Sequence, residues 1–222
     1  MTLIQCAAVL FDMDGVLVDS TPAVIRVWTI WAQAHGFDPS EVIHKAHGRP
    51  SLATIRELLP NGDHEAENRE VERREIEDIA DVTALPGALG LLQSIPRKRW
   101  AVVTSATRRL AEVRLRAAGL PAPSHLVTAT DLHRGKPFPD PYLKGAEVLG
   151  IAPPDCVVAE DAASGIRSGK AAGARVLALR TTSPDAEILS AGADWLADDL
   201  SWLSLAPQGQ TVPLAFLLKA NK

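Results

Sequence analysis

The chain has 222 residues, of which 46% are hydrophobic and 23% charged, an ordinary composition for a globular protein. Its formal net charge of −4 offers neither the basic footprint of a nucleic-acid-binding protein nor a polybasic patch for a membrane surface. The opening residues, MTLIQCAAVLFD, have no basic segment followed by a long apolar one. We therefore expect neither a signal peptide nor a membrane-spanning helix and, by default, a cytoplasmic location.

The first predicted strand is followed by two carboxylates. The apolar run CAAVL, residues 6–10, is typical of a short buried strand, and Asp12, Asp14 and Gly15 come after it. Residues i and i+2 of a strand share a face, so two like charges would raise each other's pKa unless a cation offsets them. The alternative is a solvated turn, because Asp and Gly are common turn residues. This stretch alone leaves both interpretations open.

The next segment, residues 20–82, contains no convincing strand and predicts three helices. The first spans 20–36 and begins with a Ser/Thr cap and a proline. The second spans 50–60, and the third, 63–81, is strongly charged, which is typical of a solvated helix face. The stretch TALPGALG (83–90) then leads back through a Pro-Gly turn. A small helical unit inserted after the first strand can cover a site as a lid.

From about residue 86 to 200, short apolar runs alternate with helical patterns. The predicted strands are 100–104, 126–130, 156–160 and 175–179, and the predicted helices between them are 106–118, 140–150 and 163–172. This alternation predicts a parallel, doubly wound α/β sheet, in which ligands bind at the carboxyl ends of the strands.

Polar residues gather at or near those strand ends. They are Asp12 and Asp14, Thr104 and Ser105, Lys136 in the loop RGKPFPDPYL, and Glu160 and Asp161. Each feature alone has an ordinary explanation, such as a solvated loop lysine or an acidic first turn of a helix. Because the sheet topology brings strand ends together, the set predicts one site.

The residue types at this predicted site suit phosphoryl transfer. Asp12 and Asp161, with Glu160 as a further candidate, form a hard, all-oxygen, anionic cluster that suits Mg²⁺. Lys136 and the Thr104 hydroxyl would neutralise and bind a phosphoryl group. One carboxylate can act as the nucleophile, and a second one two residues later can act as general acid and then as base.

Four segments of the chain resemble, in order and spacing, the motifs of the haloacid dehalogenase superfamily: FDMDGVLVDS, VVTSAT, GKPFPDPYLKG and VVAEDAASGI. With the helical insertion, the resemblance covers about residues 8–200. It implies a Rossmann-like doubly wound core with a small inserted helical cap of the C1 type. We expect the core at residues 1–18 and 85–222 and the cap at residues 19–84.

The same resemblance implies residue roles. Asp12 would be the nucleophile, Asp14 the general acid and base, and Thr104, Ser105 and Lys136 the phosphoryl-binding residues. Asp12, Asp161 and the backbone carbonyl of Asp14 would hold Mg²⁺, with Glu160 a ligand through water or a support. Family dehalogenases lack the second aspartate, so Asp14 favours phosphoryl transfer and predicts a phosphomonoester hydrolase.

Further segments resemble the sugar- and polyol-phosphate phosphatases of the 2-deoxyglucose-6-phosphatase and glycerol-phosphatase group. These have a His-Gly segment followed by arginine in the cap, which here is His47, Gly48 and Arg49 in KAHGRPS. His47 and Arg49 are therefore the candidate substrate contacts of the cap. In the yeast-type pattern the arginine falls one residue later and a threonine follows it. This departure leaves open which small phosphorylated metabolite is the substrate.

Two alternatives remain at this point. A phosphosugar mutase resembling β-phosphoglucomutase would carry a histidine ten residues after the second aspartate, where this chain has Val24. A non-catalytic phosphate-binding or interaction module would be expected to lose the nucleophile or the acid, and both are present. The oligomeric state stays open, as does the tail, residues 207–222, whose PLAFLL stretch could be an added edge strand or an oligomer contact.

Overall fold

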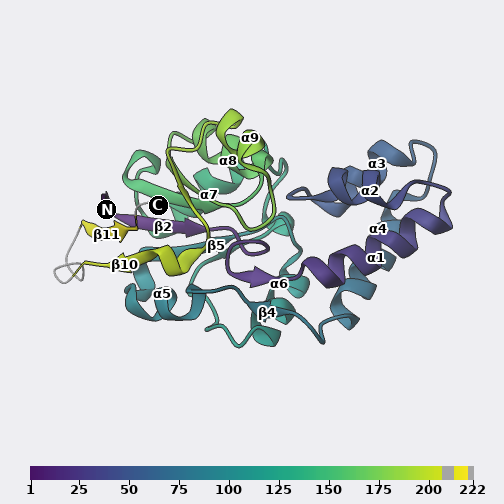
Figure 1. The fold of residues 1–222 in the computed structure, drawn as a ribbon. Helices are drawn as coiled ribbons and strands as arrows, with labels where there is room; N and C mark the ends of the chain where they lie inside the picture. The colour runs from purple at the N-terminus through teal and green to yellow at the C-terminus, as the bar shows by residue number, and fades with distance from the viewer. Residues whose placement is uncertain (207–212, 220–222) are drawn as a thin grey trace.

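A six-stranded parallel sheet lies at the centre of the larger part of the molecule (Figure 1). The computed structural model describes residues 1–206 and 213–219. The sheet strands are β2 (Ala8–Phe11), β5 (Trp100–Val103), β6 (Leu126–Val127), β7 (Cys156–Glu160), β8 (Arg175–Leu179) and β9 (Trp195–Ala197). Their spatial order, β6-β5-β2-β7-β8-β9, reverses direction beside β2, as in a doubly wound fold. The predicted fold class is confirmed.

Helices cover both faces of this sheet. They are α5 (Ala88–Ser94), α6 (Arg108–Ala117), α7 (Asp140–Leu149), α8 (Ala163–Ala171) and α9 (Asp185–Ser190). Successive side chains of β2 point to opposite faces, so Phe11 packs in one core cluster and Leu10 in the other. Every residue of β2 and β7 is buried because both faces are covered, which explains why both strands are apolar in sequence apart from Glu160 at the end of β7.

Four helices lie together to one side of the sheet (Figure 1). They are α1 (Thr21–Ala34), α2 (Pro39–Ala46), α3 (Ser51–Leu58) and α4 (His64–Glu77). They have their own apolar core, which includes Trp28, Trp31 and Ile55. The chain enters this layer through β3 (Val18–Asp19) and leaves it through β4 (Thr83–Ala84), and these two short strands pair antiparallel. The sequence analysis missed α2 and this strand pair.

The expected first strand, residues 6–10, is wrong as a single element. Cys6 ends β1 (Thr2–Cys6), which belongs to a separate antiparallel sheet with the order β1-β11-β10. The parallel sheet begins only at Ala8, because the chain changes sheets at Ala7, whose N–H donates to the carbonyl of Asp155 at 2.7 Å. No glycine or proline marks that change in the sequence.

The expected strand 126–130 is too long. It ends at Val127, because Thr128 and Asp131 form a capping box that starts a short 3₁₀ turn over Ala129–Asp131. The Thr128 hydroxyl and backbone N–H both donate to the Asp131 carboxylate, at 2.7 and 2.8 Å. These local hydrogen bonds compete with further strand pairing.

The described part of the tail forms β11 (Leu214–Leu218). It is not an edge strand, because it pairs with β1 on one side and with β10 (Leu203–Leu205) on the other. Alternate residues of β11 are buried, and Phe216 joins the core cluster on one face of the parallel sheet. Residues 207–212 and 220–222 of the expected tail lie outside the described part of the chain. Among the described residues, no helix is long and apolar enough to cross a membrane.

We predict that Phe216→Ala lowers the free energy of unfolding by about 3–5 kcal/mol, because it leaves a cavity under the small antiparallel sheet. Phe216 is 2% exposed. Leu217→Ala, at the neighbouring half-buried position, is the matched control and should cost about 1 kcal/mol. Chemical denaturation of both variants measures the difference, and equal losses would show that β11 does not contribute Phe216 to the core.

Candidate active site

The strand ends bring three carboxylates and one lysine together. Asp12 directly follows β2, and its N–H donates to the carbonyl of Ala159 in β7 at 3.0 Å. Glu160 is the last residue of β7, and Asp161 follows it. Lys136 reaches this point from the loop before α7. The sequence analysis grouped these residues correctly, because neighbouring parallel strands end at the same edge.

Lys136 is the cation at the centre of this cluster. Its Nζ lies 2.8 Å from Asp12 Oδ1 and 2.6 Å from Glu160 Oε1, and the residue is only 4% exposed. Burial alone would lower the lysine pKa, but the two carboxylates outweigh it and raise the pKa above its ordinary value. Lys136 is therefore a permanent buried ammonium. For Asp12, burial raises the pKa and Glu160 and Asp161 add to it, while Lys136 offsets only part of the rise.

Both oxygens of Glu160 already have protein donors. Oε1 accepts from Lys136 and from the Tyr142 hydroxyl, at 2.6 and 2.8 Å. Oε2 accepts from the backbone N–H groups of Asp161 and Ala162, at 2.9 and 3.1 Å. Burial would raise the Glu160 pKa, but Lys136 and these hydrogen bonds lower it below the ordinary value. Of the two roles left open for Glu160, the contacts favour a support that fixes Lys136 and the turn into α8.

The carboxylates of this cluster lie close enough together to suit a divalent cation. Asp12, Glu160 and Asp161 each offer an oxygen within 4.8 Å of the others. Three carboxyl groups face one ammonium, and burial raises the pKa of Asp12 and of Asp161, a rise that a bound cation would offset. Within the described part of the chain, Asp161 Oδ1 is buried with no hydrogen-bond partner. Gly15, with φ +78°, makes room for this carboxylate, since a Cβ there would lie 2.0 Å from Asp161 Oδ2.

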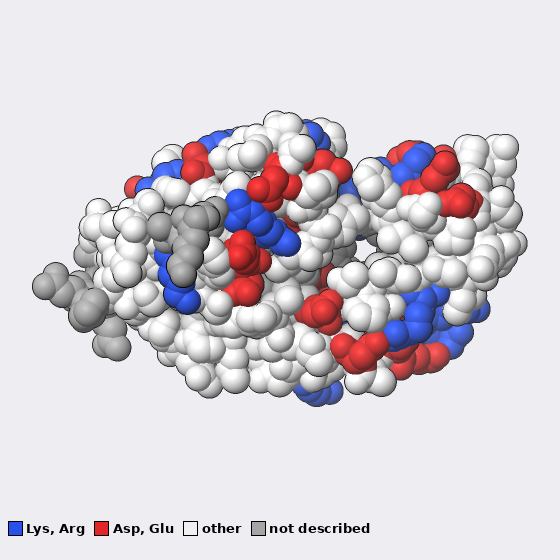
Figure 2. All heavy atoms as spheres, viewed as in Figure 1, with Lys and Arg blue, Asp and Glu red and all other residues white. Residues whose placement is uncertain are grey.

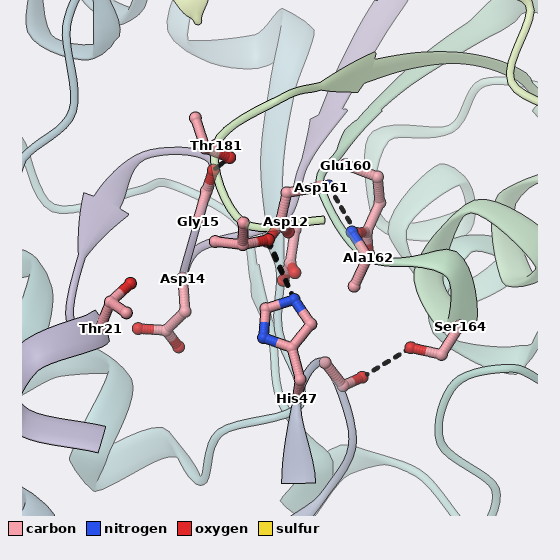
Figure 3. A network of polar contacts seen from close by, with 12 residues as sticks. Asp12, Asp14, Gly15, Thr21, His47, Glu160, Asp161, Ala162, Ser164 and Thr181 are labelled. Atoms are coloured by element: carbon pink, nitrogen blue, oxygen red, sulfur yellow. Dashed lines mark hydrogen bonds and ion pairs between the residues drawn. The ribbon is translucent and has the colours of Figure 1, made fainter. Parts of the chain in front are cut away.

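Asp14 points elsewhere. The strand ends at Phe11, so Asp12 and Asp14 lie beyond it and do not share a strand face. The Asp14 carboxylate turns toward Thr21 at the start of α1 (Figure 3). Its Oδ1 accepts from Ser20 Oγ at 2.6 Å and its Oδ2 from Arg114 Nη1 at 3.0 Å.

The two predicted hydroxyl ligands also reach the site. Thr104 is buried, and its Oγ1 accepts from the N–H of Ala106 at 3.1 Å, so its own hydroxyl proton stays available to a ligand. Ser105 Oγ lies 3.4 Å from the carbonyl oxygen of Gly48 in the helical layer. Thr104 and Ser105 both line the same cavity as Asp12.

Both cap candidates border the cavity. His47 Nε2 lies 2.9 Å from Thr182 Oγ1 and 3.5 Å from Asp161 Oδ2, and the Asp161 carboxylate raises the His47 pKa (Figure 3). Arg49 pairs with Glu57 of α3 at 3.0 Å, which holds its guanidinium on the cap side.

Gly48 allows the helical layer to pack closely against the core. Its carbonyl oxygen accepts from Ser164 Oγ at 3.0 Å, and its φ of +65° favours glycine. A Cβ at this position would lie 2.6 Å from the Ala162 Cβ. Only glycine therefore allows the loop after α2 to approach the start of α8 this closely.

The cavity itself lies between the sheet edge and the four helices, and measures about 840 Å³. Figure 2 shows the surface hollowed between these two parts of the molecule. This volume falls within the range of about 300–1,000 Å³ typical of small-molecule sites. Its lining includes residues that the sequence analysis missed: Ser20, Glu72, Glu75, Thr107, Arg114, Thr181 and Thr182. Thr181 and Thr182 follow β8 and could have been found by the same strand-end argument, whereas Glu75 and Arg114 lie within helices and carry no such signal.

Comparison with known families decides which superfamily this site belongs to. Residues 6–173 match the family model of the haloacid dehalogenase-like hydrolases. The chain belongs to this family. The resemblance drawn from the four motifs is confirmed, and the enzyme class is that of a hydrolase.

Curated relatives cover most of the chain. Hexitol phosphatase A of Escherichia coli is 46% identical over 180 residues, covering 79% of this chain and 83% of the relative. Glycerol-1-phosphate phosphohydrolase 1 of Saccharomyces cerevisiae is 36% identical, covering 79% of this chain and 75% of the relative. 2-Deoxyglucose-6-phosphate phosphatase 1 of the same yeast is 32% identical, covering 90% and 91%.

Solved structures share the fold. A hydrolase from Pseudomonas syringae superposes with a TM-score of 0.80 at 25% identity, covering 87% of this chain and 94% of that one. A β-phosphoglucomutase from Clostridium difficile superposes with a TM-score of 0.78, covering 90% of this chain and 93% of that one. Its 20% identity shows a common fold and nothing about a common reaction.

We predict that Gly48→Ala lowers kcat/KM for p-nitrophenyl phosphate, because the added methyl group collides with Ala162 and moves the helical layer off the core. Gly36→Ala is the matched control, since Gly36 also has a positive φ, +74°, but nothing lies within 4 Å of an added Cβ. Both variants should lose about 1 kcal/mol of stability. Equal kcat/KM values for the two variants would contradict this packing role of Gly48.

Proposed function

We propose that this protein is a Mg²⁺-dependent phosphomonoester hydrolase that acts on small sugar or polyol phosphates through an aspartyl-phosphate at Asp12. The observation that carries the proposal is the contact of 2.8 Å between the buried Lys136 ammonium and Asp12, at the edge of a cavity that Asp14 also lines. The phosphatase activities named for the curated relatives support the same reaction and the same substrate class.

In the first step, a carboxylate oxygen of Asp12 attacks the phosphorus atom of the ester. The Lys136 ammonium and the Thr104 hydroxyl stabilise the charge on the phosphoryl oxygens, which is the main contribution a protein makes to this transfer. Asp14 donates a proton to the leaving alcohol oxygen. The P–O bond to the alcohol breaks, and the phosphoryl group stays on Asp12.

In the second step, water hydrolyses the aspartyl-phosphate. Asp14, now a carboxylate, removes a proton from the attacking water. As the water oxygen bonds to phosphorus, the P–O bond to Asp12 breaks, which releases inorganic phosphate and restores the Asp12 carboxylate. Ser20 and Arg114 hold both oxygens of Asp14 and so fix its orientation. Asp12, Asp161 and the Asp14 carbonyl would hold Mg²⁺, which supplies positive charge to the phosphoryl oxygens when bound.

In this proposal the helical layer, with residues 19–84 as its bounds, is a cap that selects the leaving group. Arg49 and His47 are its proposed substrate contacts, and both line the cavity. The mutase alternative is less supported, because Val24 lines the cavity where such mutases carry a histidine. The non-catalytic alternative is disfavoured because the nucleophile, the acid and Lys136 are all in place.

We also propose a cytoplasmic enzyme whose partner is a small phosphorylated metabolite, with neither nucleic acid nor membrane involved. The net charge of −4 supports this part of the proposal, since it offers no basic footprint for either polyanion. The size of the cavity, about 840 Å³, supports a small-molecule partner.

The experiment that tests the proposed function replaces the nucleophile. Asp12→Asn should abolish phosphate release from p-nitrophenyl phosphate and from hexitol phosphates, because the amide cannot attack phosphorus, while the circular dichroism spectrum stays that of the folded protein. Asp155→Asn, at an exposed position, is the control and should keep wild-type rates. Appreciable turnover by pure Asp12→Asn protein would rule out an aspartyl-phosphate at this residue.

Metal removal gives a second test. The enzyme should lose activity in EDTA and regain it with Mg²⁺, because Asp12 and Asp161 offer carboxylate oxygens close enough together to hold the ion. Ca²⁺ should not restore the rate, since its larger and looser coordination would misplace Asp12. Steady-state phosphate release measures all three conditions, and full activity in EDTA would contradict a metal requirement.

A further inference from the structure

The cavity contains a second buried cation beyond Asp14. Arg114, on α6, is 4% exposed and lines the cavity. Its Nη1 donates to Asp14 Oδ2 at 3.0 Å, and its Nη2 lies 3.4 Å from Glu75 Oε1 on α4. This guanidinium therefore lies between the proposed general acid and the helical layer.

The Arg114 guanidinium is not fully hydrogen-bonded by the protein. Within the described part of the chain, its Nε is buried with no hydrogen-bond partner, and its Nη2 has only the ion-pair contact with Glu75 at 3.4 Å. Leaving a buried charged donor unpaired is costly, so such groups usually find a partner in the functional state. Because Nε has almost no exposed surface, a ligand oxygen in the cavity would reach it only if the guanidinium shifts.

Carboxylates surround this guanidinium. Glu75 is buried, and burial raises its pKa although Arg114 offsets part of the rise. One helical turn away, Glu72 Oε1 accepts from Thr107 Oγ1 at 2.6 Å, and both of these residues line the cavity. We call Arg114, Glu75, Glu72 and Thr107 the α4–α6 subsite. Asp14, Glu72 and Glu75 together outnumber the single cation.

Charge and hydrogen bonding then restrict what can bind. A hydroxyl group can donate to a glutamate and accept from the arginine at the same time, so a polyol matches both kinds of partner. A second phosphate or a carboxylate would meet Glu72 and Glu75 at short range, and like charges repel in a cavity with little water. The other arginines that line the cavity are Arg49, from the α2–α3 connection, and Arg167, from α8, and Arg49 is already paired with Glu57.

We propose that the α4–α6 subsite binds the hydroxyl groups of the leaving alcohol and selects neutral polyol monophosphates against substrates with a second anionic group. The inference rests on the proposed function, because it places the phosphoryl group at Asp12 and the alcohol oxygen at Asp14. Arg114 contacts Asp14 at 3.0 Å, and both residues line the cavity.

The test compares a hexitol 6-phosphate with the 1,6-bisphosphate of the same hexitol, with p-nitrophenyl phosphate as the ester that lacks hydroxyls. Wild-type enzyme with Mg²⁺ should prefer the monophosphate by about tenfold or more in kcat/KM. Glu75→Gln keeps the shape and removes a charge, so the monophosphate/bisphosphate ratio should fall about tenfold, mainly through KM. The kcat/KM of Glu75→Gln should fall less for p-nitrophenyl phosphate than for the hexitol monophosphate.

Glu77→Gln, on the same helix, is the matched control, since Glu77 pairs with Arg73 on the exposed side of α4 and should leave the ratio unchanged. If Glu75→Gln does not fold, Glu72→Gln removes the other glutamate charge of the subsite, at a half-buried position. Equal use of the monophosphate and the bisphosphate by wild-type enzyme would overturn the subsite. An unchanged ratio in the folded glutamine variant would overturn it as well. Absence of turnover on all three esters would instead overturn the proposed function.

Discussion

The ion pairs of Lys136 with Asp12 and Glu160 are the constraint on which the site depends. An ammonium and two carboxylates in a water-excluded interior are stable only when their charges and hydrogen bonds compensate one another. Here Tyr142 and two backbone N–H groups supply the remaining hydrogen bonds to Glu160. This arrangement fixes the lysine at the carboxyl end of the sheet and leaves its charge directed at Asp12.

The second constraint is steric, and it closes the cavity. Gly15 leaves room for Asp161, and Gly48 lets the helical layer approach α8, each with a positive φ. Neither glycine contributes a functional group. At each position, however, an added Cβ would collide with a neighbouring side chain. The site therefore depends on side chains that are absent as well as on those that are present.

The sequence was sufficient to predict the members of the cluster and the fold class. Asp12, Lys136 and Asp161 are recognisable because strand ends are local features, and a parallel sheet collects them at one edge. The apolar runs of β7 and β8 were also long enough to locate exactly. The assignment of 6–10 to one strand failed because β1 pairs with β11, which lies some 210 residues later in the chain, and nothing local marks that pairing.

Arg114 shows the same limit within the site, because it contacts Asp14 a hundred residues away and is one of several arginines on an ordinary amphipathic helix. Arg114 also explains how Asp12 and Asp14, two like charges only two residues apart, are accommodated in one site. The structure gives each carboxylate its own buried cation, Lys136 for Asp12 and Arg114 for Asp14. Since the chain turns after Phe11, the two side chains diverge and do not compete for one partner. Nucleophile and acid are thus held by separate partners, so that each can be positioned for its own role in a two-step transfer.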